Sequence, residues 1–135
     1  DKSPKALKVA KKNIKNNTVN INLLKQDIFK YQFSDKFDIL ISNPPYISED
    51  EIIDDKCKYE PSMALYANNK GLAFYEHILK ISPNIMNKKS ILAFEIGYKQ
   101  ADYLEKLSKK YYKKAKISIE TDLSGKDRYL FIINE

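Results

Sequence analysis

Apolar side chains recur along the chain with two different spacings, one helical and one alternating. Ser3 and Pro4 predict the start of a helix, because serine accepts a hydrogen bond at an N-cap and proline suits the first turn. Residues 37–42 form a nearly continuous apolar run, which is typical of a strand buried on both faces. In chain order the pattern predicts a helix over 3–16, strands over 19–27 and 37–42, a helix over 71–87, a strand over 90–96, a helix over 99–112, and strands over 115–121 and 128–133.

This order of strands and helices predicts an α/β protein with a mostly parallel sheet. The short turn at 124–126 indicates that the last two strands form an antiparallel hairpin at or near an edge of the sheet. Residues 47–69 are polar and irregular, with one short helix expected from Ser48, where Glu51 completes a capping box. No repeat or linker-like boundary interrupts the pattern, so we expect residues 1–135 to form a single domain.

Composition narrows the class of protein. The chain has 135 residues and a net charge of +6, and no apolar run approaches the roughly 18 residues that a membrane helix needs. Cys57 is the only cysteine and His77 the only histidine, which argues against a disulfide and against a structural metal site. We therefore expect a reducing compartment, the cytoplasm, no metal, and a non-catalytic role for His77.

Lysine supplies nearly all of the positive charge, and Arg128 is the only arginine. Clustered lysines can form a surface that faces nucleic acid or the ribosome. We favour the alternative that they are solvated positions spread along the chain, because bidentate arginine is the commonest device for reading bases. The clusters are Lys11-Lys12, Lys88-Lys89, Lys109-Lys110 and Lys113-Lys114.

The segment Asn43-Pro44-Pro45-Tyr46 directly follows the apolar run 37–42, and ligands of open α/β sheets bind beyond the carboxyl ends of strands. A planar –NH₂ group is a poor nucleophile because its lone pair is delocalised. The Asn43 side-chain oxygen and a backbone carbonyl can accept both of its hydrogens and orient the nitrogen. Pro44 and Pro45 stiffen the loop, and Tyr46 offers a flat face for the planar group.

This segment and several others resemble those of a known family. Residues 41–47 look like motif IV of amino-group methyltransferases that use S-adenosylmethionine. Further segments resemble the HemK-type peptide chain release factor N5-glutamine methyltransferases, in the C-terminal part of the catalytic domain. They are residues 1–7, Tyr59-Glu60-Pro61 with Ala64-Leu65, Gly71-Leu72 with Tyr75, Glu95-Ile96-Gly97-Tyr98, and 122–128. The resemblance implies a partial Rossmann-like methyltransferase sheet.

The resemblance also implies a substrate and the residues that bind it. The activity would be methyl transfer from S-adenosylmethionine to the side-chain amide nitrogen of a glutamine in a peptide chain release factor. Asn43 and the Pro44 backbone would orient that amide, and Tyr46 would pack against it. Glu60 and Pro61 would close the substrate side.

On the cofactor side, the family resemblance assigns three further positions. Asp1 matches the acidic residue that holds the ribose hydroxyls of S-adenosylmethionine. Asp27 and the following backbone, at Ile28, match the adenine side of the cofactor pocket, with Asn43 also lining it. Asp127 and Arg128 are expected to be structural and to tie the final hairpin.

The chain departs from the family in one respect. It holds no Gly-x-Gly-x-Gly run, and its three glycines stand at Gly71, Gly97 and Gly125. We therefore expect a truncated methyltransferase domain that lacks the first strands and the glycine-rich loop and is inactive by itself. Missing strands would leave an apolar edge at 37–42, so the chain is expected to dimerise, to rearrange its first strand or to be marginally stable.

Two other functions stay open. An adenine-N6 methyltransferase of DNA or RNA shares the Asn-Pro-Pro-Tyr chemistry, and the positive charge favours it slightly. A non-catalytic remnant domain that at most binds a partner would explain the absence of a glycine-rich loop.

Overall fold

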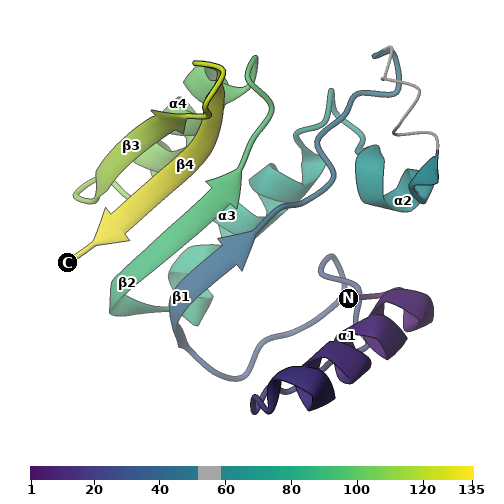
Figure 1. The fold of residues 1–135 in the computed structure, drawn as a ribbon. Helices are drawn as coiled ribbons and strands as arrows, with labels where there is room; N and C mark the ends of the chain where they lie inside the picture. Colours follow the sequence, from purple (N-terminus) through teal and green to yellow (C-terminus); the bar gives the residue numbers. More distant parts are fainter. Residues whose placement is uncertain (52–58) are drawn as a thin grey trace. The chain divides into compact units, whose positions relative to one another are not determined.

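The computed structural model describes residues 1–51 and 59–135, and it divides into two compact units. The first unit is Asp1–Phe33 and the second is Ser34–Glu135. Figure 1 shows the elements of both units. Cys57 and part of the expected short helix after Ser48 lie outside the described residues.

The first unit begins with the predicted helix, α1, over Pro4–Asn17. The Ser3 hydroxyl accepts a hydrogen bond from the Ala6 amide at 3.3 Å, as an N-cap should. The helix ends at Thr18, which adopts a left-handed conformation with φ 52°. The predicted start and end of this helix are therefore confirmed.

The strand predicted over 19–27 is wrong, because these residues form no strand in the described chain. Their backbone is tied instead to the first residue: the Asp1 amino group donates to the Leu24 carbonyl at 3.1 Å, and the Gln26 amide donates to the Asp1 carbonyl at 3.1 Å. Val19 and Ile21 are 46% and 56% exposed. A strand needs a neighbouring strand for its backbone groups, and this unit provides none among its described residues.

The second unit is built on a four-stranded sheet of order β1-β2-β4-β3 (Figure 1). Its strands are β1 (Phe37–Ser42), β2 (Met86–Glu95), β3 (Lys116–Thr121) and β4 (Asp127–Asn134). β1 and β2 are parallel, whereas β4 runs antiparallel to both β2 and β3. The α/β class and the terminal hairpin at the sheet edge are confirmed. The sheet was expected to be mostly parallel, but among the described residues one strand pair is parallel and two are antiparallel, because residues 19–27 add no strand.

Helices α3 (Ala73–Ile85) and α4 (Ala101–Tyr111) cover one face of this sheet, and a short helix, α2 (Ser62–Leu65), precedes them. The core contains the sheet residues Leu92, Phe94, Leu130 and Ile132 together with Tyr75 and Leu79 of α3 and Leu104 of α4, each at most 2% exposed. The ring of Tyr75 meets that of Phe94 edge-on at 6.0 Å. Both long helices were predicted, and α3 begins and ends two residues inside its predicted range.

β1 is exposed where burial on both faces was predicted. Ile39 and Ile41 are 60% and 79% exposed, on the sheet face that α3 and α4 do not cover. The reason is that α3 and α4 pack on the opposite face, where the β2 residues Leu92 and Phe94 are buried. In the sheet of the described residues, β1 also forms one edge and has β2 as its neighbour. The structure therefore agrees with the expected apolar edge at 37–42. None of the helices in the described ranges is long and apolar enough to cross a membrane.

Candidate functional site

The Asn43–Tyr46 segment leaves the carboxyl end of β1, next to the carboxyl end of its parallel neighbour β2. The sequence prediction of its position is therefore confirmed. Pro44 is buried, Pro45 and Tyr46 are half-buried, and Asn43 is exposed. The prolines anchor the segment against the unit while the asparagine side chain faces outward.

Tyr46 is held at both its backbone and its side chain. Its carbonyl accepts a hydrogen bond from the Gln100 side-chain amide at 3.1 Å. Its hydroxyl lies 3.4 Å from the Glu95 carboxylate, to which it donates. The next residue, Ile47, donates to the Leu65 carbonyl at 3.0 Å and accepts from the Ala67 amide at 3.0 Å. These bonds fix the path of the loop after β1 against α2 and the segment behind it.

Gly71 permits this close packing. Its φ of +79° is a left-handed conformation, and a Cβ atom there would lie 2.0 Å from the Tyr46 carbonyl oxygen. Both facts require glycine at this position. The same Gln100 side chain that holds Tyr46 also donates to the Lys70 carbonyl at 3.3 Å and accepts from the Gly97 amide at 3.0 Å. Gln100 thus joins three separate backbone segments around the loop.

A buried tyrosine, Tyr75, is hydrogen-bonded to the backbone of Glu95. The Tyr75 hydroxyl donates to the Glu95 carbonyl at 2.6 Å. Burial raises the pKa of Tyr75 far above its ordinary value, and the nearby Tyr46 and Glu95 add to the rise. Tyr75 therefore stays a neutral donor at any physiological pH.

Arg128 ties the final hairpin to the same region, as predicted. Its Nε lies 3.2 Å from the Asp122 carboxylate, and its Nη1 donates to the Ile96 carbonyl at 3.3 Å. The Ser124 hydroxyl and the backbone of the turn, together with Arg128, hold the pKa of Asp122 well below its usual range. Asp127 begins β4 opposite Thr121. This network holds the start of β4 against Ile96, the residue that follows β2.

The Asn43 side chain makes no hydrogen bond within the described part of the chain. An asparagine amide has an oxygen that accepts and a nitrogen that donates two hydrogens. Here a fixed backbone presents this group to solvent, directly after a sheet strand. Such a side chain can bind another planar amide or amine without first breaking a bond within the protein.

Three of the four predicted cofactor residues lie in the first unit. The Asp1 carboxylate accepts a hydrogen bond from the Ser3 amide at 2.7 Å. The Asp27 carboxylate accepts from the Phe29 amide at 3.1 Å and lies 3.6 Å from the Lys2 ammonium. The Phe29 hydrogen bond and, next, the charge of Lys2 lower the pKa of Asp27. Ile28 follows directly, and Asn43, the fourth residue, belongs to the second unit.

Glu60 and Pro61 are exposed, and Pro61 precedes α2. They reach the loop only indirectly, through the bond between Leu65 at the end of α2 and the Ile47 amide. The sequence prediction missed Gln100, because nothing in a lone glutamine after Gly97 signals a bond to a loop 54 residues away. The segments with Gly71, Tyr75 and Glu95 were noticed for their resemblance, without a role.

The comparisons with known proteins agree with this fold. Residues 1–58 match the family model described as "Methyltransferase small domain". Over 97% of its length the chain resembles the crystal structure of a methyltransferase from Pyrococcus furiosus, of which it covers 58%, with a TM-score of 0.69 at 17% identity. The fold is therefore that of a Rossmann-like methyltransferase.

The sequence relatives are more specific. The chain is 36% identical over 135 residues to the release factor glutamine methyltransferase of Lactococcus lactis, covering 98% of this chain and 50% of that protein. It is 40% identical over 131 residues to the enzyme of that name from Enterococcus faecalis, covering 95% and 47%. The family resemblance is thus confirmed: over nearly its whole length the chain is similar to the release factor glutamine methyltransferases, and it spans about half the length of the curated relatives it matches.

Proposed function

We propose that this chain forms part of an S-adenosylmethionine-dependent methyltransferase that methylates the side-chain amide nitrogen of a glutamine in a peptide chain release factor. The observation that carries the proposal is that nearly the whole chain aligns with enzymes of that name. The fixed Asn43–Tyr46 loop at the carboxyl end of β1 supports it, because its exposed amide suits a glutamine side chain.

In this proposal the loop orients the substrate amide. The Asn43 side-chain oxygen and the Pro44 carbonyl accept the two hydrogens of the glutamine –NH₂ group, and the Tyr46 ring lies against the amide plane. Accepting both hydrogens fixes the nitrogen and turns its lone pair outward, which is a positioning effect. Gln100, Gly71 and Glu95 act through Tyr46, so they are positioning residues.

By the family resemblance, Asp1, Asp27 with the Ile28 backbone, and Asn43 would each contact the cofactor. A carboxylate has two oxygens that accept hydrogen bonds. Oδ1 of Asp1 accepts one from the Ser3 amide, which leaves Oδ2 without a hydrogen bond among the described residues. Asp1 therefore fits the pair of ribose hydroxyls, and Asp27 with the Ile28 backbone fits the adenine side. When bound, S-adenosylmethionine supplies an electrophilic methyl group for the glutamine nitrogen.

We further propose that residues 1–135 belong to one methyltransferase domain, with Glu60 and Pro61 on the side from which the release factor approaches. A bacterial-type release factor substrate and the single cysteine of the chain favour the cytoplasm as the place of reaction. The same relatives make methylation of adenine in DNA or RNA the weaker alternative.

The test is Asn43→Ala in the longest form of the protein that contains this sequence. Methyl transfer to a glutamine-bearing release factor should fall at least about a hundredfold, because the amide is no longer oriented. Calorimetry should show that S-adenosylhomocysteine binds within a few-fold of its original affinity. Asn84→Ala, at an exposed position of α3, is the matched control and should keep full activity.

Two results of this experiment would contradict the proposal. Full activity of Asn43→Ala would remove the role given to the loop. Methylation of an adenine-bearing oligonucleotide, with none of the release factor, would replace the proposed substrate by the alternative.

A further inference from the structure

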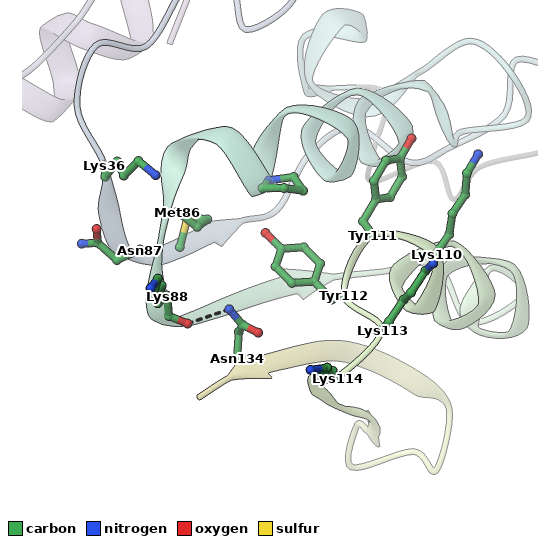
Figure 2. Close-up of a pocket in the computed structure, with 11 residues that line it drawn as sticks. Lys36, Met86, Asn87, Lys88, Lys110, Tyr111, Tyr112, Lys113, Lys114 and Asn134 are labelled. Carbon is green, nitrogen blue, oxygen red and sulfur yellow. Dashed lines mark hydrogen bonds between the residues drawn. The ribbon is translucent and has the colours of Figure 1, made fainter.

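The fold gathers lysines at the end of the sheet opposite the Asn43–Tyr46 loop. A hollow of about 480 Å³ lies there, beside the first residues of β2, the last residue of β4 and the turn that follows α4 (Figure 2). The described residues that line it include five lysines and no aspartate or glutamate. The lysines are Lys36, Lys88, Lys110, Lys113 and Lys114.

These lysines come from three separate stretches of the chain. Lys36 precedes β1 and Lys88 lies near the start of β2, whereas the other three lie at the end of α4 and just beyond it. Figure 2 shows the first two on one side of the hollow and the others across from them, with the Tyr112 ring between. The cluster is therefore a product of the fold and not of a single basic run in the sequence.

The floor of the hollow contains a buried, hydrogen-bonded tyrosine and is partly apolar. Tyr112 is 7% exposed, and its hydroxyl donates to the Ser82 hydroxyl at 2.9 Å. Pro83 and Met86 line the same floor. The Asn134 side chain donates to the Lys88 carbonyl at 2.6 Å and joins the last residue of β4 to the start of β2 (Figure 2). A low-dielectric floor under charges of one sign concentrates their electric field.

No described acidic side chain forms an ion pair with the lysines of the hollow. All five lysines are exposed. The Lys110 ammonium lies 5.6 Å from the centre of the Tyr111 ring. A nearby carboxylate, Asp38, accepts from the Asn87 amide at 2.7 Å at the margin. Like charges around one hollow repel, so their arrangement favours an anionic ligand.

We propose that this hollow binds the phosphate groups of a polynucleotide backbone, as in RNA, without reading its sequence. Lysine contacts phosphates as a point charge, and such contacts position a protein without specifying bases. The hollow is open and holds five long, flexible ammonium groups, which suits an extended chain of phosphates better than one enclosed anion. The partly exposed Tyr111 ring beside Lys110 offers a surface on which a base can stack.

The experiment measures binding of a labelled single-stranded oligouridine of about twelve nucleotides by fluorescence anisotropy, between about 50 and 200 mM salt. A triple variant, Lys88→Gln, Lys113→Gln and Lys114→Gln, removes charge from two of the three stretches. The plot of log affinity against log salt should become flatter by about two, since each lost phosphate contact on a single strand contributes about 0.7. Affinity at the lower salt concentration should fall at least about tenfold.

The matched control is Lys5→Gln, Lys8→Gln and Lys12→Gln, at exposed positions of α1, with the same change in net charge. It should keep the original salt slope. Equal losses in both triple variants would overturn the proposal in favour of general charge attraction. Undetectable binding at the lower salt concentration would also overturn it.

A competition arm separates RNA from an acidic protein segment. Polyglutamate with the same number of charges should displace the oligouridine much less effectively than unlabelled oligouridine does. Equal displacement would overturn the assignment to a polynucleotide and indicate an acidic polypeptide as the partner. Circular dichroism of both triple variants should match the original protein, because every substituted lysine is exposed.

Discussion

The two ends of the sheet in the second unit are built in opposite ways. At the carboxyl end of β1, side chains hold the backbone: Gln100 bonds the Tyr46 carbonyl, and Gly71 packs against the same atom. At the opposite end of the sheet, exposed lysine side chains surround a hollow. Orienting one amide requires a fixed loop, whereas attracting a polyanion requires only charge density. Substitutions should therefore affect stability strongly at the first end and weakly at the second.

Gly71→Ala is expected to have the largest effect. A Cβ atom 2.0 Å from the Tyr46 carbonyl oxygen, on a backbone with φ +79°, can be accommodated only if the loop moves. The free energy of unfolding should fall by about 3 kcal/mol or more. Urea denaturation followed by circular dichroism measures this change.

Gly125→Ala is the matched control for that experiment. Gly125 has a similar φ of +77°, but a Cβ atom there meets no other atom within 4 Å. Its cost should be only about 1 kcal/mol, the cost of a left-handed alanine. If both variants lost the same amount, backbone conformation alone would account for Gly71 and the close packing of the loop would contribute nothing.

Tyr75 should make the free energy of unfolding depend on pH in the alkaline range. Its pKa in the folded protein is raised above the ordinary value of 10.0, so the unfolded chain loses the phenol proton first. The stability that depends on this proton is fully present below pH 10.0 and is lost progressively as the pH rises above it. Tyr75→Phe should make this alkaline loss shallower.

The same variant should cost about 1 kcal/mol at neutral pH, because the hydrogen bond to the Glu95 carbonyl is lost. Urea denaturation at a series of pH values measures both effects. Tyr59→Phe, at a side chain that is 94% exposed, is the control and should change neither. An unaltered alkaline profile in Tyr75→Phe would mean that other groups cause the loss.

The sequence predicted the elements whose pattern arises from local geometry. The N-cap at Ser3, the two long helices, the final hairpin and the loop at Asn43 were all placed correctly. The prediction of a strand over 19–27 was wrong. Alternating apolar residues indicate only a tendency to pair with another strand, and the described residues of this unit hold no strand to pair with. The 37–42 run was a strand, but its burial depended on neighbours that the pattern could not reveal.

The sequence patterns could not predict which side chains the fold brings together from distant positions in the chain. Gln100 lies 54 residues from the loop that it holds, and only the fold brings them together. The lysine pairs were interpreted as spread along the chain, because their separation in sequence is all that a pattern records. In the structure, Lys88, Lys113 and Lys114 line one hollow, and each was already prominent in the sequence.

The smallest effect is expected at the lysine end. Lys113→Gln with Lys114→Gln should change the free energy of unfolding by less than about 0.5 kcal/mol, because both side chains are exposed and unpaired among the described residues. The change should be a slight stabilisation at low salt, since two of the five like charges around the hollow are removed. At about 1 M salt it should vanish, because screening then acts within about 3 Å.

The effect of this substitution on stability at low and high salt would distinguish three kinds of surface. If the lysines were solvated side chains that lie far apart on an ordinary surface, their removal would leave the free energy of unfolding unchanged at every salt concentration. If they contributed packing or ion pairs to the fold, their removal would destabilise the protein at low salt, and the contrast between the two ends would fail. A stabilisation confined to low salt indicates repulsion among charges that the fold tolerates without using them for its own stability. Urea denaturation at low and high salt, with Lys5→Gln and Lys8→Gln on α1 as the control, measures that difference directly.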